Sequence, residues 1–153
     1  MINFVVDRKY NKFIDRTRIT NIIEKAFFIL EVETVPDLSI IITGDNKLRS
    51  LNKSYRGIDE TTDVLSFCNE YLDLETGIKY LGDIFISYPR ADEQAKLGGH
   101  RTDQELELLI VHGLLHLEGY DHDENSNKIE MWKLQSQILE SSGNMVSVDG
   151  DSL

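Results

Sequence analysis

The chain has little cysteine, no long hydrophobic run and too few basic residues to balance its acidic ones. A single cysteine in 153 residues excludes an internal disulfide and favours a reducing cytoplasm. No apolar run approaches the ~20 residues that a membrane-spanning helix needs. The opening residues, MINFVVDRKYNKF, lack the pattern of a signal peptide. We therefore expect a cytoplasmic protein that has no membrane partner.

Acidic residues dominate the charge. There are 16 Lys and Arg against 27 Asp and Glu, a formal net charge of -11, and the sequence pI is near 4.7. Such a chain is a poor match to a protein that holds nucleic acid by its overall charge. An RNA partner would need a local basic patch, a metal that meets the phosphate, or help from another protein.

Length and hydrophobic pattern indicate one domain over residues 1–153, with a polar tail from residue 141 that we expect to fray. The pattern predicts four strands and five helices. A Thr102–Glu105 capping box starts the fourth helix, and the fifth has Ile129, Trp132, Leu134 and Ile138 as expected core positions. The strands are expected at 2–6, 38–43, 64–67 and 80–87, and the helices at 17–31, 45–55, 89–97, 102–118 and 124–140. This order favours an α+β fold with one mixed, mainly four-stranded sheet packed with helices.

Three of the four histidines fall within residues 112–122, HGLLHLEGYDH. His112 and His116 are four residues apart, so on a helix both imidazoles project from one face. Gly119 can adopt a left-handed conformation that ends the helix and turns the chain back. His122 can then approach as a third ligand.

Three nitrogen ligands suit one zinc ion per chain and leave its fourth tetrahedral position for water, which implies hydrolysis. Other divalent transition metals, namely nickel, cobalt, copper and iron, could also be accepted. The predicted helix therefore resembles the zinc-binding helix of the metzincin peptidases, which has the same histidine spacing.

One position departs from the metzincin pattern. Those peptidases carry a glutamate after the first histidine as general base, and this chain has Gly113. Two possibilities therefore stay open for the motif: a peptidase-like or other zinc hydrolase, or a non-enzymatic protein whose metal is structural. A structural zinc normally has four protein ligands, and no cysteine lies near the motif to be the fourth.

Three stretches together resemble the YbeY endoribonucleases, bacterial metal-dependent factors of ribosomal RNA maturation. The histidine motif matches that family's signature, LNKSYRGIDETTDVLSF at 51–67 resembles a second family segment, and YLGDIFIS at 80–87 resembles a third. The downstream helix with Met131 also resembles its C-terminal helix. Where the family loop usually has Lys and Pro, this chain has Ile58 and Thr61, which lowers the local positive charge.

The resemblance implies zinc held by His112, His116 and His122, and an RNA-binding or catalytic role for Arg56. The implied activity is hydrolysis of single-stranded RNA in 16S rRNA 3′-end maturation and ribosome quality control. The implied partners are ribosomal RNA and the small ribosomal subunit. Two alternatives to a nuclease stay open: another zinc hydrolase, peptidase-like, or a non-enzymatic ribosome-assembly factor with a structural metal. The sequence leaves the oligomeric state open.

Four further residues are weaker candidates. Asp63, Asp83 and Asp121 could each accept a hydrogen bond from a ligand imidazole and so orient it, or could be ordinary turn and strand-end residues. His100 has no ligand spacing to the other histidines, and we expect it to lie exposed in a loop.

Overall fold

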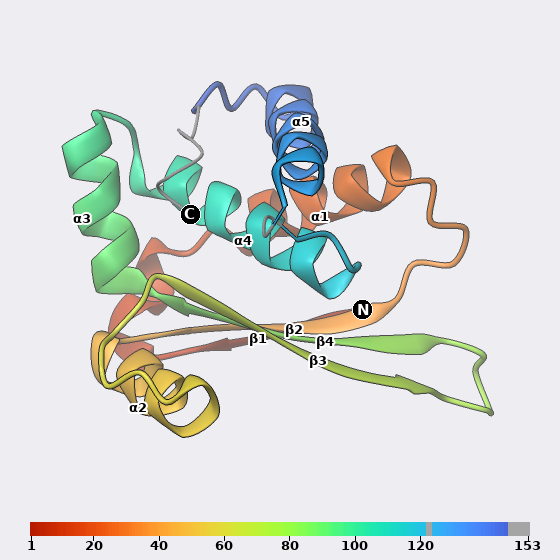
Figure 1. Ribbon diagram of the computed structural model, residues 1–153, viewed down its shortest axis with the longest axis horizontal. Helices are drawn as coiled ribbons and strands as arrows, with labels where there is room; N and C mark the ends of the chain where they lie inside the picture. The colour runs from red at the N-terminus through yellow and green to blue at the C-terminus, as the bar shows by residue number, and fades with distance from the viewer. Residues whose placement is uncertain (122–123, 147–153) are drawn as a thin grey trace.

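Three parallel strands and one antiparallel strand form the sheet that organises the protein (Figure 1). The computed structural model describes residues 1–121 and 124–146. The strand order is β1-β2-β4-β3, in which β1, β2 and β4 run parallel and β3 pairs with β4 in an antiparallel hairpin. The strands are β1 Ile2–Val6, β2 Asp37–Thr43, β3 Val64–Leu72 and β4 Lys79–Ser87.

The helices are divided unequally between the two faces of the sheet. Figure 1 shows α1, α4 and α5 over one face, α3 at the end of the same layer, and α2 alone on the opposite face. No helix of the described residues is long and apolar enough to span a membrane. The helices are η1 Arg8–Phe13 (a 3-10 helix), α1 Arg16–Ile29, α2 Asp45–Arg56, α3 Tyr88–Gly98, α4 Thr102–Leu117 and α5 Asn125–Ser141.

The predicted α+β architecture with a mixed four-stranded sheet is confirmed. Two elements differ from the prediction. Strand β3 continues beyond Phe67 to Leu72, and its added residues are exposed, so their pattern carries no buried period. The short helix η1 was not predicted, because residues 8–13 are mostly polar and none is buried.

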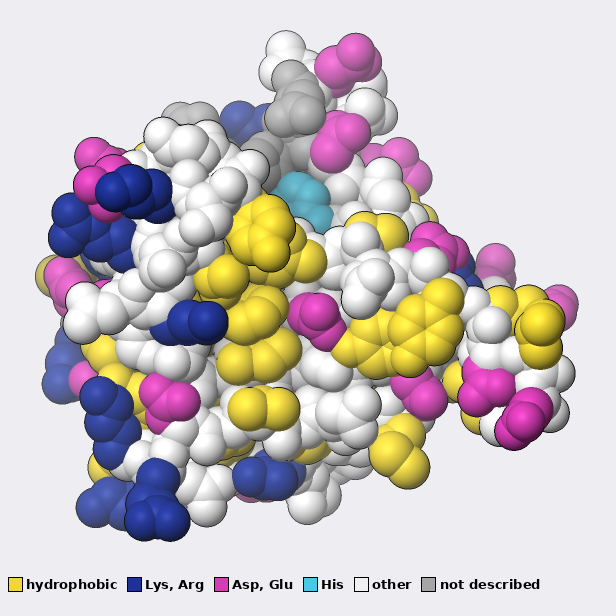
Figure 2. Space-filling view, turned by 90° about the horizontal axis from the view of Figure 1, so that it is seen from below, with side chains coloured by type: hydrophobic (Ala, Val, Ile, Leu, Met, Phe, Trp, Pro, Cys, Tyr) yellow, Lys and Arg dark blue, Asp and Glu magenta, His cyan; other side chains and the backbone are white. Residues whose placement is uncertain are grey.

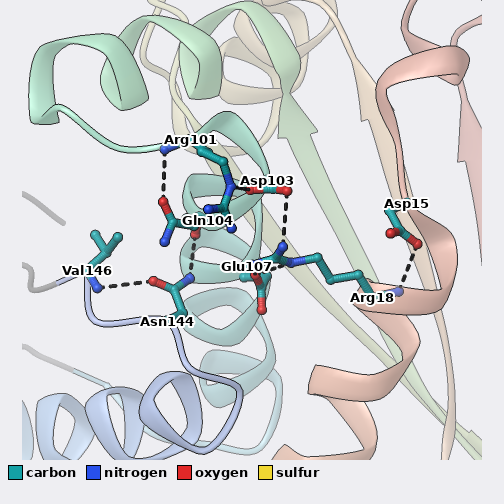
Figure 3. Close-up of polar contacts among 8 residues, drawn as sticks. All are labelled: Asp15, Arg18, Arg101, Asp103, Gln104, Glu107, Asn144 and Val146. Atoms are coloured by element: carbon teal, nitrogen blue, oxygen red, sulfur yellow. Dashed lines mark hydrogen bonds and ion pairs between the residues drawn. The ribbon is translucent and has the colours of Figure 1, made fainter.

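Helix α4 is the centre of the core. From Glu105 to Leu115 every residue is buried, including two acidic side chains that need partners because burying an unpaired charge is costly. Burial raises the pKa of Glu107, although the Arg18 guanidinium opposes this shift. Figure 3 shows Arg18 reaching from α1 to Glu107 and Asp103, so α1 and α4 are joined through charge as well as packing.

The start of α4 differs from the predicted capping box. Gln104 supplies the capping side chain, because its Oε1 accepts the N–H of Arg101 at 2.9 Å. Thr102 instead donates its hydroxyl to Asp92 of α3 at 2.8 Å, and Glu105 turns into the interior. The threonine and glutamate therefore join α3 to α4 rather than cap the helix.

The segment after α5 makes an ordered contact where we expected a frayed tail. Asn144 is 1% exposed, and its side chain donates to the carbonyl of Gln104 and accepts the N–H of Val146 (Figure 3). The expectation for the rest of the tail concerns residues 147–153, which lie outside the described residues.

Candidate metal centre

Helix α4 carries the first two motif histidines, one turn apart. After Leu117 the chain turns at Gly119, whose φ is 96°, and the N–H groups of Gly119 and Tyr120 bond back to His116 and Leu115. This left-handed ending is the one that the glycine predicted. It reverses the chain within three residues of His116.

The two imidazoles converge on one point. Their Nε2 atoms lie 3.0 Å apart, and the ring planes cross at 82° with centroids 4.6 Å apart. Two imidazole nitrogens on one tetrahedral zinc, each about 2.0–2.1 Å from it, would lie about 3.3 Å apart. His112 is buried and His116 is partly exposed, so the pair lies at the border between core and solvent. The donor set and spacing fit a shared cation.

Gln135 orients His112. This residue of α5 is 3% exposed, and its Oε1 accepts the Nδ1–H of His112 at 3.1 Å. The bond places the ring proton on Nδ1 and leaves the Nε2 lone pair for a metal, as is usual for ligand histidines.

Sequence reasoning missed Gln135 because it considered only the apolar residues of α5, of which Ile138 is buried as predicted and Leu134 packs against the core. Ile129, an expected core position, is 52% exposed, and the buried positions of α5 are Met131, Gln135, Ile138 and Leu139. Gln135 follows Met131 by four residues and precedes Ile138 by three. A polar residue at helical spacing between two apolar core residues was the sequence signal that could have identified Gln135.

The third predicted ligand, His122, lies outside the described residues. Within residues 1–121 and 124–146 no group of three His, Cys, Asp or Glu side chains could hold a metal ion. Of the three predicted ligands, His112 and His116 lie in the described part of the chain.

Gly113 lies where α4 packs closely against β3 and β4. A Cβ at this position would lie 2.8 Å from Ser66 Oγ on β3 and 2.9 Å from Ile84 Cγ2 on β4. The Ser66 hydroxyl donates to the Gly113 carbonyl at 3.0 Å. The fold has no room here for the glutamate that a metzincin carries.

Arg56 is exposed in the last turn of α2, on the opposite face of the sheet from α4. Its neighbour Tyr55 contacts Phe67 of β3, with ring centroids 4.9 Å apart. Ser66, the next residue back on β3, touches Gly113. The arginine is thus connected to the histidine helix through one strand.

His100 is less exposed than expected, with 16% of its side chain accessible. Its Nε2 lies 2.5 Å from the carboxylate of the buried Glu105. Gln94 of α3 donates to Glu105 at 2.9 Å and to Asp63 at 3.3 Å. Our expectation of an exposed loop histidine was wrong, because a buried carboxylate needs a donor and His100 is within reach.

Two of the three aspartates that could have oriented a ligand, Asp63 and Asp83, have other partners. Asp63 accepts from Thr62, Val64 and Gln94, and Asp83 accepts from Tyr80. Neither bonds a motif histidine within the described residues. Asp121 accepts a bond of 3.5 Å from Asn127.

Burial raises the pKa of Asp63, and the nearby charge of Glu105 adds to this effect. The unfolded side chain ionises near pH ~3.9, below its folded value. The contribution of Asp63 to the free energy of unfolding is therefore largest below that pH, and it falls as pH rises through the folded pKa. We expect the free energy of unfolding of Asp63→Asn, relative to the wild type, to increase with pH in urea titrations above about pH 4.

Asp59→Asn is the control for this prediction. The Arg49 guanidinium lowers the pKa of Asp59. The free energy of unfolding of Asp59→Asn, relative to the wild type, should therefore decrease as pH rises. A flat difference for Asp63→Asn would show that its carboxyl is not destabilised by burial.

Comparisons with known proteins cover nearly the whole chain. A family model described as "Endoribonuclease YbeY" matches residues 4–143. An endoribonuclease YbeY from Listeria welshimeri is 40% identical over 147 residues, which is 87% of this chain and 91% of the relative. One from Heliobacterium modesticaldum is 41% identical over 131 residues, covering 77% and 79%.

One solved structure has a similar fold over nearly the whole chain. The solution structure of a Thermotoga maritima protein superposes with a TM-score of 0.61 at 29% identity. The match covers 93% of this chain and 89% of that one.

Proposed function

Because this chain belongs to the endoribonuclease YbeY family, we propose that it is a metal-dependent endoribonuclease that cleaves single-stranded RNA. The observation that carries the metal dependence is the 3.0 Å approach of two imidazole Nε2 atoms, with a third motif histidine shortly after the helix end. The family relationship supports RNA as the substrate.

We propose His112, His116 and His122 as ligands of one zinc ion, although other divalent transition metals would also fit such nitrogen donors. When bound, a zinc ion supplies Lewis acidity to a phosphate oxygen and acidifies water. The protein's own part is to hold the lone pairs in place: α4 sets the spacing of two rings, and Gln135 fixes the tautomer of His112.

We propose that Arg56 binds the phosphate that is cleaved. Its guanidinium is exposed and makes no ion pair with any residue in the described part of the chain, so its fork of donors is available to two phosphate oxygens.

We further propose that the biological substrate is the 3′ end of 16S rRNA on the small ribosomal subunit in the cytoplasm, in maturation and quality control. Purified protein should cleave single-stranded RNA and leave casein intact, since Gly113 cannot act as the general base of a metallopeptidase. Cleavage of casein without cleavage of RNA would reverse the assignment. Unchanged 16S 3′ ends in cells that lack the activity would remove the ribosomal part.

Removing the side-chain oxygen that orients His112 should weaken the metal centre. Gln135→Leu leaves the Nδ1–H of His112 without its buried acceptor, so the ring loses its fixed orientation. Partners of this kind are typically worth about 10–100-fold in metal affinity. We expect a loss of that size in the zinc affinity, measured by competition with a chromophoric chelator.

Gln137→Leu is the matched control, because Gln137 is exposed two residues further along the same helix. It should bind zinc as the wild type does. Equal zinc affinity in Gln135→Leu and Gln137→Leu would show that the His112–Gln135 bond does not support the ligand.

A further inference from the structure

Positive charge is concentrated at one end of this acidic protein. Of its 16 lysines and arginines, half lie in two segments, residues 8–16 and helix α2. Figure 2 shows Lys and Arg side chains gathered at the end of the molecule that carries α2, with Asp and Glu prominent at the opposite end. These eight cations are Arg8, Lys9, Lys12, Arg16, Lys47, Arg49, Lys53 and Arg56.

Most of these cations lack a carboxylate partner. Arg49 and Lys53 pair with Asp59, and the other six form no ion pair with the residues that the structure describes. Elsewhere paired lysines are found, such as Lys79 with Glu70 and Lys96 with Asp92. The basic end therefore has charge available for an anionic partner.

Aromatic rings lie among the cations of η1. Tyr88, at the start of α3, stacks with Tyr10 and with Phe13 at centroid distances of 4.9 and 5.8 Å. Phe13 is 53% exposed. The ammonium groups of Lys9 and Lys12 lie 5.2 and 5.0 Å from the ring centroids of Tyr10 and Phe13. Charge and flat apolar surface are thus presented together.

A surface hollow adjoins this aromatic stack. It has a volume of about 530 Å³, is lined by residues 11–17 and includes Lys12, Phe13 and Arg16. The carboxylate in the hollow, Asp15, already caps α1 by accepting the N–H of Arg18 at 3.1 Å. The hollow therefore offers two cations and a ring beside an acid that is engaged elsewhere.

Helix α2 connects this surface to strand β3, whose Ser66 contacts Gly113 on the histidine helix. The Tyr10 hydroxyl lies 3.4 Å from the position that a Cβ of Gly44, the N-cap of α2, would occupy. The helix is about 18 Å long by its rise per residue and ends with the Tyr55–Phe67 contact on β3. The six cations without an ion pair to a described residue, Arg56 among them, therefore lie on η1, at the start of α1 and on α2.

We propose that η1 and the start of α1 bind single-stranded RNA upstream or downstream of the cleavage site, and that α2 guides the strand towards His112 and His116. The cations would neutralise phosphates, and the exposed face of Phe13 would stack on an unpaired base. This proposal rests on the proposed function and explains how a chain of net charge -11 holds RNA.

Binding is best measured in the His116→Ala background, which keeps the labelled RNA intact during anisotropy titrations at several salt concentrations. Lys9→Ala/Lys12→Ala should reduce the slope of log K against log salt by about 1.4, since each single-strand phosphate contact contributes about 0.7. Phe13→Ala should weaken binding about tenfold and leave that slope unchanged.

Lys25→Ala/Lys133→Ala, on α1 and α5 away from this surface, is the charge-matched control and should change neither quantity. Circular dichroism establishes that each variant is folded. Wild-type affinity and slope in the η1 variants would overturn the proposal, as would equal binding of duplex RNA that is insensitive to Phe13→Ala. Wild-type protein that binds RNA through η1 without cleaving it would refute the nuclease alone.

Discussion

Replacing His116 by alanine is expected to remove bound zinc and to lower the rate of RNA cleavage more than about 100-fold, a larger loss than that for a group that only supports a ligand. The physical reason is the loss of one of two nitrogens that converge within 3.0 Å. Because His116 is partly exposed at the end of α4, its removal leaves the core intact. Zinc content by atomic absorption and cleavage of a labelled single-stranded RNA measure the two effects.

Arg56→Ala separates metal binding from substrate binding. It should retain about one zinc per chain while cleavage falls, because an exposed arginine on α2 contributes nothing to the ligand set. Full cleavage by His116→Ala, with zinc retained, would contradict the proposed ligand. Full cleavage by Arg56→Ala would remove its assigned role.

Gly113→Glu is expected to prevent folding or to reduce the free energy of unfolding by more than about 4 kcal/mol, the range reserved for severe core defects. The substitution restores the metzincin general base in sequence alone. In space its Cβ would meet Ser66 and Ile84, and its carboxylate would be buried without a partner. Urea unfolding followed by circular dichroism measures the loss.

Gly113→Ala tests the steric part by itself. Its cost should be about 1–3 kcal/mol for overpacking, reduced by the roughly 1 kcal/mol that alanine gains over glycine in a helix. Ser136→Glu, on the exposed face of α5, is the control for an added helix carboxylate and should change stability little. A stable Gly113→Glu protein would show that α4 can move away from the sheet.

Gly113 also bears on the rival peptidase interpretation. The sequence showed only that a general base was missing, whereas the structure shows why it is missing. Glu118 is the nearest acidic residue to Gly113 along the chain. Burial raises the pKa of its carboxyl, Lys79 of the β3–β4 hairpin opposes this shift, and Glu70 of the same hairpin adds to it. The position where a peptidase has its general base is Gly113, and there α4 packs directly against β3 and β4.

Local patterns predicted most of the elements, because they depend on residues close together in the chain. In strand β1 partly buried and exposed residues alternate over all five positions. Helix α4 is the long apolar helix that its leucines indicated. Helix η1 has no buried residue and so carried no hydrophobic period. The position of η1 is set by contacts of Tyr10 with Gly44 and Tyr88, which are distant in sequence.

The i, i+4 spacing of His112 and His116 determined by itself that two imidazoles meet, since helix geometry alone brings them to one face. Gly119 likewise determined the turn that follows, through its φ of 96°. Only the tertiary structure decided the partner of His112, the absence of space beside Gly113, and the meeting of η1 with α2. Each depends on how elements pack across the sheet, and packing joins residues whose separation in the chain leaves no periodic trace.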